Sequence, residues 1–173
     1  MVELRADARR NLERVLDAAT EVFAESGPDA SVDEIAKRAG VGHATVFRRF
    51  PTKDDLMFAV IERRVEEMRA IAKEALAAED PGAAFFDFVH RVAELSMSTP
   101  GLHRCVVHCG EKPGAAELEA LGGKIVARAQ RAGALRKDVK PAQVGPFIRD
   151  ALTAAPAGEW RRYLEVVLDG LRA

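Results

Sequence analysis

The sequence predicts an all-α protein of about nine helices. Nearly every apolar run keeps the i, i+3, i+4 spacing that gathers side chains on one face of a helix, and no segment gives a convincing strand pattern. Helix-ending residues fall between these runs, as at Gly27-Pro28 and at Asp80-Pro81-Gly82. Short helices come first and longer ones follow. We therefore expect an N-terminal domain over residues 1–55 and a C-terminal helical bundle over residues 56–173.

The predicted helices can be placed in order along the chain. An apolar stripe from Leu12 to Phe23 forms the first helix. Ser31 and Glu34 fit a capping box at the start of the second helix, which Gly40 ends as a C-terminal cap. A third helix is expected from 43 to 50. A fourth, capped by Thr52 with Asp55, runs to 78. Five more are expected near 83–98, 102–109, 115–132, 142–155 and 159–171.

Composition and charge are those of an ordinary globular protein and exclude a uniformly basic one. Of the 173 residues 48% are hydrophobic and 31% charged, and the net charge is −1, so the chain is not a uniformly basic nucleic-acid coat. Residues 1–55 hold nine Lys and Arg against eleven Asp and Glu. A DNA-binding surface there would need its basic and acidic side chains sorted onto different faces.

The sequence predicts a cytoplasmic protein with no membrane partner. The two cysteines form no disulfide framework, which favours a reducing compartment. No window approaches 18 uncharged apolar residues, and the first ten residues, MVELRADARR, lack the apolar core of a secretory signal.

The second and third helices are joined by the short segment AGVG, which is typical of a helix-turn-helix. Gly40 permits the left-handed backbone that such a turn requires. Phe50 is expected to pack inward, whereas Phe47, Arg48 and Arg49 remain on the outer face, where guanidinium groups can bind phosphate or guanine. The alternative is a plain helical hairpin whose basic edge is solvated.

Residues from about 10 to 60 strongly resemble the DNA-binding domain of the TetR (tetracycline-repressor-like) transcriptional regulators. The family's small-Thr-aliphatic-aromatic run corresponds to Ala44-Thr45-Val46-Phe47, and its F..K..L ending corresponds to Phe50, Lys53 and Leu56. Its earlier patterns correspond to Ala18, Ala19, Phe23 and Gly27, and to Ile35, Ala36, Ala39, Gly40 and Val41.

The resemblance implies binding to a double-stranded DNA operator and assigns contacts to named residues. Thr45, Phe47, Arg49 and Lys53 would meet the DNA backbone, and His43, Ala44 and Arg48 would lie nearest the bases. Ser31 matches a position that often contacts phosphate. Phe47 departs from the family, which commonly has tyrosine there, so one hydroxyl contact to phosphate is missing.

The end of the chain carries a long apolar stripe, which we interpret as a four-helix interface in a homodimer. Its members are Leu152, Trp160, Leu164, Val167, Leu168 and Leu171. We call the third helix the reading helix, since it would contact the bases. Two-fold symmetry would place the reading helices of two copies in successive major grooves of a palindromic site. The alternative is that this stripe is ordinary core.

The resemblance also implies that the C-terminal domain binds a small-molecule effector. The segment AAFFDFVHRVAEL is rich in rings. The expected ligand-binding residues are Phe85, Phe86, Val89, His90, Met97, Leu121, Ile125 and Phe147. The alternative is that these side chains are plain core. We predict a repressor that its effector releases from the operator.

Cys105, His108 and Cys109 offer a rival site. They share one face of a short helix, as ligands of a soft metal would, which suggests a metal- or redox-responsive regulator as the alternative function. An enzyme is not expected, because these thiols and imidazoles lie on one local helix without a third group or a nucleophile turn. No cofactor is expected either: Gly122-Gly123-Lys124 lacks the remaining residues of a phosphate loop.

Overall fold

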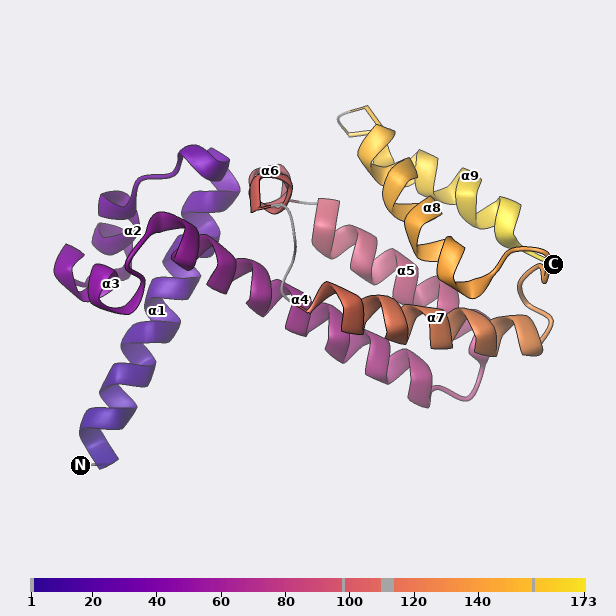
Figure 1. Cartoon of the computed structure of the whole chain (residues 1–173), viewed down its shortest axis with the longest axis horizontal. Coiled ribbons are helices and arrows are strands. Elements are labelled where there is room, and N and C mark those ends of the chain that lie inside the picture. Colours follow the sequence, from indigo (N-terminus) through magenta and orange to yellow (C-terminus); the bar gives the residue numbers. More distant parts are fainter. Residues whose placement is uncertain (1, 98, 110–113, 157) are drawn as a thin grey trace. The chain divides into compact units, whose positions relative to one another are not determined.

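A computed structural model describes residues 2–97, 99–109, 114–156 and 158–173 (Figure 1). These residues form nine α-helices and one short 3₁₀ turn, with no β-strand among them, so the predicted all-α fold is confirmed. The bounds of eight helices lie within one or two residues of those predicted, whereas the first helix begins at Val2, ten residues before the apolar stripe that predicted it. The elements are α1 (Val2–Ser26), η1 (Gly27–Asp29), α2 (Val32–Ala39), α3 (His43–Arg49), α4 (Lys53–Ala77), α5 (Pro81–Met97), α6 (Pro100–Cys109), α7 (Ala115–Arg131), α8 (Pro141–Ala154) and α9 (Trp160–Leu171).

Helix ends follow the sequence at two of three predicted caps. Gly40 ends α2 in the left-handed conformation, with φ of 64°. At the start of α4 the Asp55 amide donates to Thr52 Oγ1 at 3.1 Å, and the Thr52 amide donates to Asp55 Oδ2 at 2.9 Å. Ser31 is the N-cap of α2, but its side chain makes no capping hydrogen bond. The predicted capping box there is wrong because the Glu34 carboxylate instead binds Arg38, one turn along the helix.

The chain folds into two compact units. The first comprises Met1–Arg64 and Thr99–Pro113, and the second comprises Val65–Ser98 and Gly114–Ala173. Helix α4 begins in the first unit and continues into the second. Helix α6 belongs to the first unit, where it packs on α1 and η1. The predicted division between residues 55 and 56 stays a prediction.

The core of the first unit lies between α1, α2, α3 and the start of α4. Val22 and Phe23 of α1 pack in the interior with Ile35 of α2 and Leu56 of α4, and all four are fully buried. Helix α6 approaches α1 so closely at Gly101 that a Cβ there would lie 2.2 Å from the backbone oxygens of Phe23 and Ala24. Only glycine fits such a contact.

The second unit has its own core, made by α5, α7, α8, α9 and the second half of α4. Phe85, Ile125, Leu164 and Leu168 are among its most deeply buried side chains. Helix α7 packs on α5 and α8, and α8 packs on α9 (Figure 1). Over the described residues, no helix is both long and apolar enough to cross a bilayer.

Candidate nucleic-acid interface

One side of α3 packs against the rest of the first unit, and the other side is exposed to solvent. Val46 is buried, and so is Phe50, just after the helix. The amide of Thr45 donates to the Gly42 carbonyl at 2.8 Å, which closes the first turn of α3 directly after the glycine-containing loop. Phe47 stays exposed, as predicted from its position between the buried residues.

The two arginines of α3 are exposed and unengaged. Among the described residues, neither Arg48 nor Arg49 has a hydrogen-bond or ion-pair partner. Both lie in the last turn of α3. Their guanidinium groups are therefore available to an anion from outside the chain, and Arg48 also has the geometry to bind a base edge with two hydrogen bonds.

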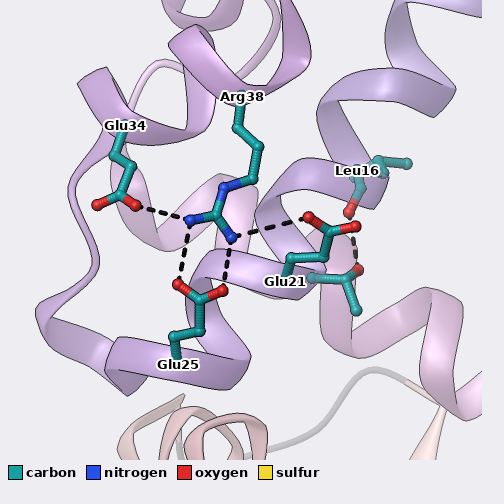
Figure 2. Close-up of polar contacts among 6 residues, drawn as sticks. Leu16, Glu21, Glu25, Glu34 and Arg38 are labelled. Atoms are coloured by element: carbon teal, nitrogen blue, oxygen red, sulfur yellow. Dashed lines mark hydrogen bonds and ion pairs between the residues drawn. The ribbon is translucent and has the colours of Figure 1, made fainter.

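Arg38 on the neighbouring helix α2, in contrast, is bound by acidic side chains of its own chain. Figure 2 shows the Arg38 guanidinium between the carboxylates of Glu21, Glu25 and Glu34. Its Nη1 donates to Glu25 Oε1 at 2.7 Å, and its Nη2 donates to Glu25 Oε2 at 3.1 Å and to Glu34 at 2.8 Å. The hydrogen bond from Arg38 lowers the pKa of Glu25, and the same bond raises the pKa of Arg38. Arg38 thus joins α2 to α1 and is occupied within the chain.

The charges of the first unit are accordingly sorted. Glu21 and Glu25 of α1 bind Arg38, whereas the arginines of α3 have no ion-pair partner among the described residues. This arrangement is what a DNA-binding surface requires in a segment whose formal charge is negative.

Two other predicted phosphate contacts lie beside α3. Lys53, the first residue of α4, is partly buried, and its Nζ donates to the Pro28 carbonyl at 2.6 Å. An ammonium group carries three hydrogens, so two donors remain. Ser31 is exposed at the start of α2, and Thr45 is partly buried on α3. Ala44 is exposed in the first turn of α3.

His43 is the first residue of α3, and it is held from two sides. Its Nδ1 forms a hydrogen bond with Asp33 Oδ1 in the first turn of α2. Its ring also stacks on Phe47, with the ring centroids 4.4 Å apart and the planes 22° from parallel. Sequence reasoning missed Asp33, because an acid in the first turn of a helix is accounted for by the helix dipole alone.

The predicted effector residues divide into two groups. Phe85, Val89 and Ile125 are buried in the core of the second unit, and Phe86, Met97 and Leu121 pack against it. His90 and Phe147 are exposed, and neither belongs to that core. Six of the eight predicted residues therefore share one core, and whether they bind a ligand stays a prediction.

His90 lines a surface groove of about 280 Å³ between α5 and α9. Trp160 and Leu164 form its apolar wall, and Glu94 binds the Arg161 guanidinium through both carboxylate oxygens, at 2.7 and 2.8 Å. The Arg161 guanidinium also lies over the Trp160 ring, 4.3 Å from its centroid. The polar groups of this groove are largely satisfied by each other.

The predicted interface stripe is mostly covered by its own chain. Val167 is partly buried, and the others, Leu152, Trp160, Leu164, Leu168 and Leu171, are buried in the core of the second unit. The large apolar side chains that α8 and α9 leave exposed are instead Phe147, Tyr163 and Val166, at 48%, 38% and 67%. Helical periodicity correctly located an apolar face on α8 and α9. It did not predict that Phe147, Tyr163 and Val166 would stay exposed to solvent.

Only part of the rival metal site falls within the described side chains. Cys105 is buried and is not part of a disulfide among the described residues, and the side chains of His108 and Cys109 lie outside the description. Within the described part of the chain, no group of three or more His, Cys, Asp or Glu residues is placed to hold a metal ion.

Comparison with known families gives matches over most of the chain. Residues 15–60 match the family described as bacterial regulatory proteins, tetR family. Residues 80–173 match the C-terminal domain of SbtR-like transcriptional regulators.

Solved structures resemble the whole chain. A TetR transcription regulatory protein from Mycobacterium vanbaalenii is 40% identical, with 98% of this chain and 99% of that chain covered and a TM-score of 0.73. A TetR transcriptional regulator from Streptomyces coelicolor is 28% identical, with 92% and 97% covered and a TM-score of 0.69.

Curated relatives match over the N-terminal segment. A helix-turn-helix transcriptional repressor of Mycobacterium tuberculosis is 53% identical over 49 residues, which make up 28% of this chain and 26% of that protein. The chain thus spans about a quarter of the length of the first curated relatives it matches.

Proposed function

Because the chain belongs to the TetR family of transcriptional regulators, we propose that it acts as a homodimeric repressor that a small-molecule effector releases from a palindromic operator. TetR-family regulators are DNA-binding transcription factors and not enzymes. The observation that carries the proposal is the pair Arg48 and Arg49, exposed on α3 and without partners among the described residues. Since the target is DNA, we propose the cytoplasm as the compartment.

The proposed DNA contacts follow from exposure and chemistry. Arg48, His43 and Ala44 would face base edges, where a guanidinium group recognises guanine through O6 and N7. Arg49, Thr45 and Ser31 would bind phosphate oxygens, and Phe47 would pack on the sugar-phosphate backbone. Lys53 would bind phosphate through the hydrogens that the Pro28 carbonyl leaves free.

A dimer is needed because one short helix reads few bases. A two-fold axis places two such helices one turn of DNA apart, about 34–36 Å. We propose that α8 and α9 of two copies form this interface. The support is the exposed apolar set on these helices, Phe147, Tyr163 and Val166, with the partly buried Val167 beside it.

Release by an effector is proposed as a population shift. Helix α4 begins at Lys53, next to the reading helix, and runs on into the unit that holds the aromatic core. A ligand that binds this core better in one arrangement of α4 would change the separation of the two reading helices. Members of the family commonly bind small molecules, which agrees with this step.

Selection of bound duplexes from a random DNA pool tests the proposal directly. We expect a palindrome to be enriched and its affinity to fall steeply with salt, because phosphate contacts release counterions. Arg48→Ala should lower the operator affinity by about tenfold or more while the chain stays folded. Arg131→Ala, which removes an exposed arginine from α7, is the matched control and should bind as the wild type does. Enrichment of no sequence by ligand-free protein would contradict the proposal.

A further inference from the structure

Asp33 and His43 form a contact across the turn of the helix-turn-helix. Asp33 lies in the first turn of α2, and His43 is the first residue of α3. Their hydrogen bond joins Oδ1 of the carboxylate to Nδ1 of the imidazole. Both side chains are open to solvent, His43 at 52% and Asp33 at 78%. An ion pair so exposed adds little to folding stability. The effect of this hydrogen bond is to orient the imidazole ring of His43.

The hydrogen bond decides which ring nitrogen carries a hydrogen. An ionised carboxylate only accepts, so the Nδ1 of His43 must be the donor. In the neutral ring the other nitrogen, Nε2, then has a free lone pair and accepts hydrogen bonds. The stack on Phe47 fixes the plane of the same ring. The structure therefore fixes both the direction and the hydrogen-bonding character of Nε2.

We propose that Asp33 is a positioning residue for operator recognition, which fixes the tautomer of His43 so that Nε2 reads one base pair. This inference rests on the proposed function, because it assumes that α3 enters the major groove. Asp33 itself acts through His43. The specificity lies in whether Nε2 meets a donor or an acceptor on the base edge.

The major groove makes the consequence specific. A neutral His43 accepts through Nε2 and so favours the amino groups of adenine N6 or cytosine N4. An Nε2 that carried the ring hydrogen would instead favour O6 and N7 of guanine. The tautomer that Asp33 selects should therefore set the base preferred at one operator position.

The charged groups around the imidazole are few among the described residues. On α2, Asp33 binds the ring, and Lys37 lies one turn further along the same side. Glu34 and Arg38 are bound to each other and, through Arg38, to α1. On α3 itself the cations Arg48 and Arg49 lie more than one turn away along the helix. Among the described residues of α2 and α3, Asp33 is thus the only acidic side chain bound to His43.

The test uses the full chain and a panel of duplexes. The operator enriched from the random pool is resynthesised with each of the four bases at every position. Dissociation constants are then measured for the wild type, Asp33→Ala, Asp33→Asn and His43→Ala. Asp33→Asn is the matched variant of similar shape, since its amide carries no charge and can either accept from Nδ1 or donate to it. Thermal unfolding checks that each variant is folded.

We expect one position at which the wild type prefers adenine or cytosine to guanine. Asp33→Ala should weaken that preference about threefold to tenfold, the worth of one hydrogen bond, and His43→Ala should abolish it. Asp33→Asn should bind every duplex more tightly, because one negative charge near phosphate is gone, and should weaken the base preference, because its amide can also donate to Nδ1 and so pair with the other tautomer.

Two results would overturn the inference while leaving the DNA-binding function intact. One is an unchanged base preference in Asp33→Ala. The other is a loss of affinity in His43→Ala that is equal for all duplexes, as a phosphate contact alone would give. Failure of the wild type to enrich any duplex would instead overturn the proposed function, and the inference with it.

Discussion

At the scale of single residues, Gly40 has two reasons to be glycine. Its φ of 64° is one that other residues adopt only with strain. A Cβ at this position would also lie 2.5 Å from Nη2 of Arg14, which donates to the Gly40 carbonyl at 3.4 Å. An added methyl group must therefore push the Arg14 side chain away from the turn that precedes α3.

Gly40→Ala should lower the free energy of unfolding by about 1–2 kcal/mol, through backbone strain and the lost hydrogen bond. Urea unfolding measures this change. Gly133→Ala is a matched control, because Gly133 has φ of 79° with open space around its Cβ position. We expect Gly133→Ala to lower the free energy of unfolding by about 1 kcal/mol and to leave the operator affinity unchanged. Gly40→Ala should lower both the free energy of unfolding and the operator affinity. Equal operator affinities for the two variants would contradict the role assigned to this turn.

At the scale of the elements, similar sequence signals had different outcomes. Ser31-x-x-Glu34 and Thr52-x-x-Asp55 both read as helix starts, and Asp55 makes the predicted reciprocal hydrogen bonds. Glu34 does not, because Arg38 offers its carboxylate a charged donor one turn along α2. Spacing along the chain predicts that a helix begins. The spacing does not reveal which group the Glu34 carboxylate will bind, because the fold of α1 against α2 gathers further acids around Arg38.

The contact between α2 and α1 should depend on pH in a definite direction. Arg38 lowers the pKa of Glu25 in the folded chain from the ordinary value of 4.5, so this pair stabilises fully above that pH. Its contribution is lost as the pH falls through the lowered pKa of Glu25. We expect Arg38→Ala to unfold at a lower temperature than the wild type at about pH 7, and the difference to shrink at about pH 3. Thermal unfolding at both pH values checks this, and a difference that grew in acid would contradict it.

Loss of Arg38 also leaves Glu21, Glu25 and Glu34 close together without their shared cation. Their mutual repulsion adds to the destabilisation of Arg38→Ala at neutral pH. Because α2 carries the turn that leads into α3, operator affinity should fall with the loss of this contact.

At the scale of the whole molecule, the apolar stripe of α8 and α9 shows the limit of periodicity. The stripe was predicted as an interface between two copies, and most of it is covered within one chain. A helical period locates an apolar face, but it cannot tell whether the chain itself or a second copy covers that face. The exposed side chains beside the stripe, Tyr163 and Val166, were not part of the predicted set. The fold and the reading helix were predictable because they depend on local spacing.

Val166→Asp and Leu168→Ala separate an interface from a core. Val166 is 67% exposed, and Arg162 lies one turn before it, so an aspartate there should leave the single chain folded. In the dimer it would bury an unpaired charge, which should weaken association about a hundredfold or more. Leu168 is fully buried, so Leu168→Ala should instead cost about 2–5 kcal/mol of folding stability. Sedimentation across protein concentrations and urea unfolding measure the two effects. If Leu168→Ala dissociated a stable, folded dimer and Val166→Asp did not, the originally predicted stripe would be the interface.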